Sequence, residues 1–328
     1  GMGMSTYLGG AWGTTEKNYN KINFTDFNKE ALKETVVGGW AAIVQHYFVA
    51  AWIPDAKAKN HFTSRANDKG EYFIGFSSPD ITVNAGMQNS ISAKLYAGPK
   101  IQDELAKLST GLDLTVDYGW LWFIAQFLFW LLKNIHGFLG NWGWSIVGLT
   151  IVVKLAFFHL SATSYKSMAN MRRVAPEMQR IKEQYGSDRQ KTSQAMMDLY
   201  KKEKINPVSG CLPMLVQMPV FLALYWTLME SVELRHAPWL LWITDLAAMD
   251  KFFVLPLIMG ATMYIQQLLN PQPTDPMQAK VLKIMPVMFT VFMLWFPSGL
   301  VLYWVVNNTL SIVQQWIITR QIEGAKAK

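Results

Sequence analysis

The stretch that decides the fold is residues 144–163, which read WSIVGLTIVVKLAFFHLSAT. It has the length of roughly 20 apolar residues that a helix needs to cross the hydrocarbon core of a bilayer. Lys154 stands about ten residues from either end, roughly 15 Å from each membrane surface at 1.5 Å per residue. We therefore predict a membrane-spanning helix with a lysine near its middle.

Four further segments have similar character, and together with the first they predict a bundle of five spans. They are residues 211–231, 252–269, 282–296 and 300–319. Several contain prolines, which membrane helices tolerate better than soluble ones. The tryptophan-rich residues 118–139 are short for a span, because only about 15 of them are apolar. We predict an interfacial helix there, with a true span as the alternative.

Composition supports a membrane protein in two unlike parts. Hydrophobic residues make up 51% of the 328 residues and charged residues only 16%, against roughly 25% charged in a soluble domain. The single cysteine, Cys211, excludes an internal disulfide and any site with several cysteine ligands. The net charge of +7 does not require nucleic acid, since cytoplasmic loops of membrane proteins collect lysine and arginine.

Residues 1–117 read as a soluble β domain. Apolar runs rich in aromatic and β-branched residues, at 40–53, 72–76 and 91–96, alternate with turn signals. A helix is expected from Pro99 to Leu108. We expect a partial β-sandwich without catalytic residues, whose beginning is missing. The chain starts without a signal peptide.

The distribution of charge predicts the topology. Residues 164–206 hold ten lysines and arginines against five acidic residues, and 270–283 and the C-terminus are also basic. The positive-inside rule places these segments in the cytoplasm and residues 1–143 outside, which requires an upstream signal or anchor that this sequence lacks. Apolar residues at helical spacing predict a helical hairpin over 164–206, with a stop and N-cap at 186–188 and a kink or break at Pro176.

Lys154 is the residue most suggestive of function. A cation at the centre of a span costs about 2.5–3.5 kcal/mol on an insertion scale, so it persists where it faces water or a partner. No acidic residue lies deep in the five predicted spans to pair with it. We interpret Lys154 as exposed in a polar cavity, with Thr150 one turn earlier on the same face; a lysine that snorkels to the surface is the alternative.

Other signals are weaker. Many of the 18 methionines lie in the predicted bundle. They either pack the interior of the bundle or form a surface that adapts to different apolar helices. No phosphate-binding loop or zinc motif is present. A transporter is the leading rival interpretation. An intramembrane protease built on Ser298 and His159 is a distant third. The basic residues of 164–206 are compatible with binding to ribosomal RNA or to anionic lipid. A helix face that is only exposed to water is the alternative.

Several motifs resemble those of the YidC/Oxa/Albino family of membrane-protein insertases, in its Gram-negative form. They are MANM at 168–171, NPVSGCLP at 206–213, QMPVFLALY at 217–225, SVELR at 231–235, TDPM at 274–277 and LWFPSGLVLY at 294–303. Residues 1–117 are similar to the second part of that family's periplasmic domain. The resemblance covers nearly the whole chain, but not the family's first membrane helix.

The resemblance implies a fold and a non-enzymatic function. The fold is a multi-span α-helical membrane bundle of five core helices (144–328, with the cytoplasmic hairpin 164–206), an interfacial helix and link (118–143) and a partial β-sandwich periplasmic domain (1–117). The implied function is insertion and chaperoning of new inner-membrane proteins, alone or with the Sec translocon. A hydrophilic groove open to cytoplasm and lipid would receive the substrate, without a cofactor.

The resemblance also implies roles for particular residues. Lys154 matches a groove cation that is usually arginine, and Thr150 matches a groove-lining threonine. Substrate helices would slide along Met218, Phe221, Phe292, Tyr303 and Trp304, the last standing where tyrosine is common. The hairpin would use Met168, Met171, Arg172 and Arg173. Implied partners are nascent membrane proteins, the Sec translocon, the ribosome, the signal-recognition-particle pathway and anionic lipids, at the bacterial inner membrane.

Overall fold

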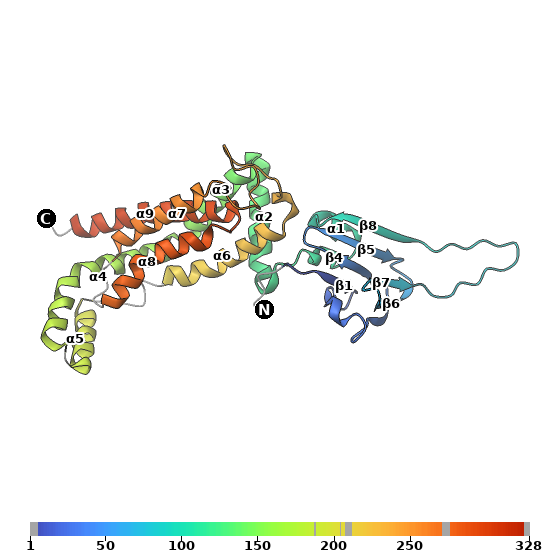
Figure 1. Ribbon diagram of the computed structural model, residues 1–328, viewed down its shortest axis with the longest axis horizontal. Helices are drawn as coiled ribbons and strands as arrows, with labels where there is room; N and C mark the ends of the chain where they lie inside the picture. The colour runs from blue at the N-terminus through green and yellow to red at the C-terminus, as the bar shows by residue number, and fades with distance from the viewer. Residues whose placement is uncertain (1–5, 187, 204, 207–211, 271–275, 325–328) are drawn as a thin grey trace. The chain divides into compact units, whose positions relative to one another are not determined.

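The computed structural model describes residues 6–186, 188–203, 205–206, 212–270 and 276–324. The chain divides into two compact units. One is formed by Gly1–Trp122 with Met229–Glu233, and the other by Phe123–Leu228 with Leu234–Lys328. The first is built mainly of strands and the second of helices (Figure 1).

Two antiparallel sheets form the first unit. The five-stranded sheet has the order β2-β1-β4-β5-β8, and the three-stranded sheet has the order β3-β6-β7. The strands are β1 (Gly9–Gly13), β2 (Asn20–Ile22), β3 (Lys33–Val37), β4 (Trp40–Val44), β5 (Phe48–Pro54), β6 (Lys59–Ala66), β7 (Tyr72–Ser77) and β8 (Ala93–Pro99). Helix α1 (Gln102–Leu108) and short 3-10 turns η1 (Phe24–Asp26), η2 (Leu112–Thr115) and η3 (Gly119–Leu121) complete it.

Alternation along the central strand β4 explains the packing of this unit. Trp40, Ala42 and Val44 belong to a core that includes residues of α1 and η2. Ala41 and Ile43 belong to a second core that they share with Phe62 and other residues of the three-stranded sheet. Successive side chains of a strand point to opposite faces, so one strand contributes to both cores.

The predicted β structure is confirmed, and so is a helix that ends at Leu108. The apolar run 40–53, for which no internal boundary was predicted, is a hairpin of two strands, β4 and β5. Its turn is closed by the Gln45 N–H, which donates to the Phe48 carbonyl at 2.9 Å. The turn contains neither glycine nor proline, so the sequence carries no signal for it.

A buried ion pair joins the two chain segments of the first unit. The Lys100 ammonium donates to Glu230 Oε2 at 3.3 Å and to the Thr115 carbonyl at 3.2 Å. Both charged side chains are almost completely buried. Burial lowers the pKa of Lys100, although the neighbouring Glu230 carboxylate acts to raise it. The His46 ring also donates to the Met229 carbonyl at 2.7 Å.

The second unit consists of helices. They are α2 (Trp122–Leu139), α3 (Trp142–Ala156), α4 (Phe158–Tyr185), α5 (Arg189–Lys202), α6 (Leu212–Glu230), α7 (Val254–Leu269), α8 (Pro276–Met293) and α9 (Ser298–Gly324), with the turn η5 (Val232–Leu234). Helix α9 packs against α3, α4 and α7, and α8 packs against α7 (Figure 1). Four predicted spans correspond to α6, α7, α8 and α9, although Cys211, at the start of the first of these, lies outside the described residues.

The expectation of a continuous helix over 144–163 is wrong. Helix α3 ends at Ala156, α4 begins at Phe158, and the two are bent by 68°. The Gln314 amide of α9 donates to the Phe158 carbonyl at 3.2 Å, so a side chain of another helix contacts the backbone beside the bend. Among the described helices none alone combines the length and apolarity of a membrane span, whereas α3 and α4 do so together.

Helices α4 and α5 form the expected helical hairpin. Its core contains Val174, Met178, Leu199 and Ile205. Asp188 caps α5 by accepting from the Gln190 and Lys191 N–H groups, as the sequence predicts. Of the two expectations for Pro176, a kink or a break, the break is wrong, because α4 continues through this proline. Ser187 of the predicted stop lies outside the described residues.

The buried ion pair predicts a test of the first unit. Glu230→Gln leaves the Lys100 charge buried without its partner, which costs about 3–5 kcal/mol. We expect faster hydrogen exchange of β4 and β5 amides in this variant. The double variant Lys100→Met, Glu230→Leu should recover most of the lost protection, because two apolar side chains replace the pair.

Lys21→Ala is the control, since it removes a half-exposed ion pair with Asp117 in the same unit. Such pairs contribute under about 1 kcal/mol. Equal effects of Glu230→Gln and Lys21→Ala would contradict a structural role for the buried pair.

Candidate functional site

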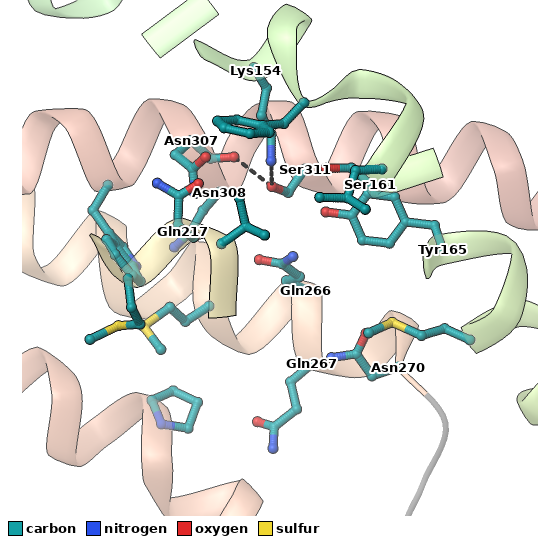
Figure 2. Close-up of a pocket in the computed structure, with 18 of the residues that line it drawn as sticks. Lys154, Ser161, Tyr165, Gln217, Gln266, Gln267, Asn270, Asn307, Asn308 and Ser311 are labelled. Carbon is teal, nitrogen blue, oxygen red and sulfur yellow. Dashed lines mark hydrogen bonds between the residues drawn. The ribbon is translucent and has the colours of Figure 1, made fainter. Parts of the chain in front are cut away.

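Lys154 is held at the end of α3 by a side chain from α9. Its ammonium donates to Ser311 Oγ at 2.6 Å, and the Ser311 hydroxyl donates to the Asn307 carbonyl at 2.8 Å (Figure 2). The lysine is half-buried, and α3 ends two residues later at the bend into α4. The cation therefore lies among helices, with its long stem extended toward α9.

Lys154 lines a cavity formed by α3, α4, α6, α7, α8 and α9. Counting its open mouth, the cavity measures about 1360 Å³. Figure 2 labels ten polar residues around it: Lys154, Ser161, Tyr165, Gln217, Gln266, Gln267, Asn270, Asn307, Asn308 and Ser311. Its apolar lining includes Met168, Met218, Met263 and Met285. The cavity is a groove that combines polar groups and one cation with apolar, adaptable thioether walls.

The polar lining is almost entirely uncharged. Lys154 is the one lysine, arginine, aspartate or glutamate among the described lining residues. Among those described residues, no ion pair of Lys154 is found either. Three buried atoms at or beside the groove have no hydrogen-bond partner among the described residues: Gln267 Oε1, Gln315 Oε1 and Trp304 Nε1. Because buried polar atoms are nearly always paired, these atoms are sites where water or a polar group of a ligand can bind.

A polar stripe on α9 supplies much of this surface, and the sequence analysis missed it. Asn307, Asn308, Ser311, Gln314 and Gln315 recur at helical spacing in an otherwise apolar segment. Such spacing puts them on one face of the helix. The same periodicity that reveals an apolar face in a soluble helix reveals a polar face here, so the signal was present in the sequence.

The structure brings four of the predicted site residues together and separates others from them. Lys154, Met168, Met218 and Trp304 line the groove. Thr150 does not line it: its side chain is buried, and its hydroxyl donates to the Ile146 carbonyl of its own helix at 2.7 Å. One turn of helix separates Thr150 from Lys154, and the lysine side chain extends to Ser311 of α9.

The remaining predicted contact residues form an aromatic cluster beside the groove. Phe221 packs edge-on against Trp304 with ring centroids 4.8 Å apart. Tyr303 is fully buried and its hydroxyl accepts from the Gln217 amide. Phe292 is exposed and contacts Phe296 at 4.8 Å. Phe292 is thus the predicted contact residue outside the groove that is most accessible on the surface of the bundle.

The predicted hairpin residues have separate environments. Arg173 forms an ion pair with Glu203 at 2.6 Å, which ties α4 to the end of α5. Arg172 is exposed. Met171 packs against the hairpin core, whereas Met168 lies in the groove, 3.9 Å from the Gln315 amide.

The protease interpretation is wrong. Ser298 is buried and its hydroxyl donates to the Asp245 carbonyl at 2.9 Å. His159 is next to Phe158, which contacts Gln314 of α9. Ser298 and Gln314 are sixteen residues apart on that helix, or about 24 Å at 1.5 Å per residue, so Ser298 and His159 cannot act on each other.

The second unit is thus a helical bundle with a groove between its helices, lined by polar side chains, apolar side chains and one cation. Two family models match this chain: "60Kd inner membrane protein" over residues 134–326 and "YidC periplasmic domain" over residues 1–131. The chain belongs to the YidC family of inner-membrane proteins.

Named relatives agree with this assignment. A protein named "Membrane protein insertase YidC" from Ectopseudomonas mendocina (strain ymp) is 64% identical over 98% of this chain. A protein of the same name from Stutzerimonas stutzeri (strain A1501) is 65% identical over 99% of this chain. The chain spans 56% and 58% of their respective lengths. A crystal structure of an active YidC insertase with its first transmembrane domain resolved matches with a TM-score of 0.53. It is 21% identical and covers 86% of this chain and 78% of that one, which supports the fold.

The groove predicts a difference in water access between two adjacent residues of α7. Gln266 lines the groove, whereas Ile265 is exposed on the outside of the bundle. In vesicles, a cysteine at position 266 should react with a membrane-impermeant maleimide, because thiols ionise in water; a cysteine at position 265 should not. The variants Gln266→Cys and Ile265→Cys are made in a Cys211→Ser background and compared by mass shift.

Equal labelling of the two cysteines, or preferential labelling of position 265, would contradict a water-filled groove in the membrane. Labelling after solubilisation in denaturant is the control that both thiols are present and reactive.

Proposed function

We propose that this protein is a membrane-protein insertase and chaperone, which lets a polar segment of a new protein cross part of the membrane while its apolar helix passes into lipid. The observation that carries the proposal is the half-buried Lys154 ammonium in an otherwise uncharged groove. The names of the relatives support the proposal. This chain aligns with more than half of the length of each of them.

In the proposed mechanism the free energy comes from the substrate. An apolar helix of about 20 residues gains free energy on leaving water for lipid, but its polar tail must cross an apolar layer. The groove provides water, amide and hydroxyl groups along part of that path, so the tail remains hydrated or hydrogen-bonded. The proposed process includes no covalent step, cofactor or nucleotide.

Lys154 is proposed to attract the negative charge of the tail. Two opposite charges 4 Å apart interact with about 4 kcal/mol at an effective dielectric constant of 20, against about 1 kcal/mol in water. Ser311 positions the ammonium but cannot neutralise it, so the charge remains available to a substrate. Lysine in place of arginine preserves this long-range attraction, although it cannot form the planar two-point contact of a guanidinium.

We propose partners and a topology on the same basis. Substrates are nascent membrane proteins, and Met218, Phe221, Phe292, Tyr303 and Trp304 guide their apolar helices. The five core helices lie in the inner membrane, α2 lies along its outer surface, and the β unit is periplasmic. The α4–α5 hairpin and the C-terminus are cytoplasmic, where their basic residues meet ribosomes, the signal-recognition-particle pathway or anionic lipid. The Sec translocon is a further proposed partner.

Reconstitution tests the proposal. Purified protein in liposomes should insert a single-span protein with a short acidic tail, measured by protection of the tail from external protease. Lys154→Ala should slow insertion by about tenfold or more, since a loss of about 1.4 kcal/mol in the barrier corresponds to tenfold in rate. Lys154→Arg is the matched control and should retain most of the activity, because it retains the charge.

The substrate provides a second control. A version with an uncharged tail should insert at similar rates with the parent protein and Lys154→Ala. If Lys154→Ala inserts every acidic-tailed substrate as well as the parent does, the role of the lysine is wrong; if the parent inserts no substrate, the proposed function is wrong.

A further inference from the structure

The loop between η5 and α7, residues 235–253, combines backbone strain with exposed apolar side chains. Among the described residues, three non-glycine residues have left-handed φ angles, and all three lie in this loop: His236, Leu241 and Phe253. Strain of this kind persists where the surrounding structure holds it in place, and it is often associated with function.

Leu241 is the clearest example. The Ile243 N–H donates to the Leu240 carbonyl at 3.0 Å, which makes a tight turn with Leu241 at its first inner position. Its φ of 51° is one that glycine, asparagine or aspartate adopts more readily than leucine. The Leu241 side chain is 86% exposed, so packing of this side chain against the described residues does not compensate for the strain. Burial of the side chain in something outside the described residues would make a leucine in this position more favourable.

The loop is rigid enough to present such side chains. The Asp250 carboxylate accepts from the Trp242 indole at 2.9 Å, from the Phe252 N–H at 3.0 Å and from the Leu255 N–H at 2.8 Å. The Ser298 N–H at the start of α9 donates to the Ala248 carbonyl at 2.7 Å. The loop is therefore fixed to the ends of α7 and α9.

The side chains and charges of the loop fit a lipid surface. Leu240, Leu241 and Phe252 are exposed, and the aromatic residues Trp239 and Trp242 lie in the same loop. Tryptophan and leucine are typical of the zone between lipid headgroups and acyl chains. Both acids of the loop have partners within the protein, Asp250 in the contacts above and Asp245 with His236 at 3.2 Å. The Asp250 carboxylate is also buried, so it does not lie on the exposed surface of the loop.

We propose that the 235–253 loop is a membrane anchor, which inserts Leu240, Leu241 and Phe252 into the interfacial zone of the bilayer at the membrane surface where α7 and α9 begin. The occupant of this surface is phospholipid. The anchor would fix the height of α7 and α9 in the bilayer, and thereby the depth of the groove between them. The inference rests on the proposed membrane location of the bundle, but not on insertase activity.

Site-directed spin labelling of the full chain in phospholipid vesicles tests the anchor. Single-cysteine variants Leu241→Cys and Phe252→Cys are made in a Cys211→Ser background. Relaxation of each label by oxygen, which concentrates in lipid, is compared with relaxation by a water-soluble nickel chelate. We expect both labels to be relaxed more by oxygen than by the chelate. Phe252→Cys keeps the test available if Leu241→Cys fails to fold.

Two control positions define the scale. Thr244→Cys, exposed and polar in the same loop, should be relaxed more by the chelate. Leu257→Cys, 62% exposed on α7, should be relaxed strongly by oxygen as a lipid-facing position. If labels at 241 and 252 behave like that at 244 while 257 contacts lipid, the anchor is wrong although the bundle is in the membrane.

Two other outcomes also overturn the anchor. Protection of the labels at 241 and 252 from both relaxants would mean that protein covers the loop instead of lipid. If the label at 257 is also relaxed mainly by the chelate, the bundle is not embedded in lipid, and the proposed function fails with the anchor.

Discussion

The helical unit depends on how a single cation is accommodated between apolar helices. Lys154 contacts a serine instead of a carboxylate, at 2.6 Å, and the lining of its groove contributes amides and hydroxyls but no acid among the described residues. A buried ion pair would have neutralised the charge, as Glu230 does for Lys100 in the first unit. Lys100 and Lys154 thus show two ways to hold a lysine away from water, in an ion pair or against neutral polar groups. Only the second leaves the charge available to a ligand.

Other features of the bundle follow from keeping that cation solvated. The polar stripe of α9 provides Ser311 for the ammonium and Gln314 for the carbonyl of Phe158 at the bend between α3 and α4. The bend directs α4 away from the line of α3, and the groove lies among the helices on either side of it. Some buried polar atoms, such as Gln267 Oε1, have no partner among the described residues and can accept a hydrogen bond from water or a ligand.

Much of the fold could be predicted from local patterns, because they act over a few residues. The β unit follows from alternation along strands such as β4, and the cap of α5 follows from Asp188. The bend at Phe157 could not be predicted from local patterns, since the backbone beside it contacts a glutamine more than 150 residues later in the chain. The hairpin turn at Gln45 was hidden for another reason: its residues are not turn formers.

The site was predictable in part for the same reasons. Lys154 was evident because a central cation is costly, whereas Thr150 was misplaced because helical spacing alone does not define which face borders a cavity. The amide side chains of α9 recur at helical spacing, which predicts a polar face, but the apolar residues around them dominate the segment. Contacts such as Gln217 with Tyr303 depend on the assembled bundle, and sequence patterns do not contain them.

The central claim is that the charge of Lys154 acts directly on the charge of a substrate tail, and reciprocal charge reversal measures this most directly. Insertion rates are compared for the parent protein and Lys154→Glu, each with an acidic-tailed and a lysine-tailed version of the same single-span substrate. The account predicts that Lys154→Glu loses the acidic-tailed substrate and gains the lysine-tailed one, so that the order of preference inverts. An unchanged order of preference would contradict it, because the groove would then act without regard to the sign of the charge at position 154.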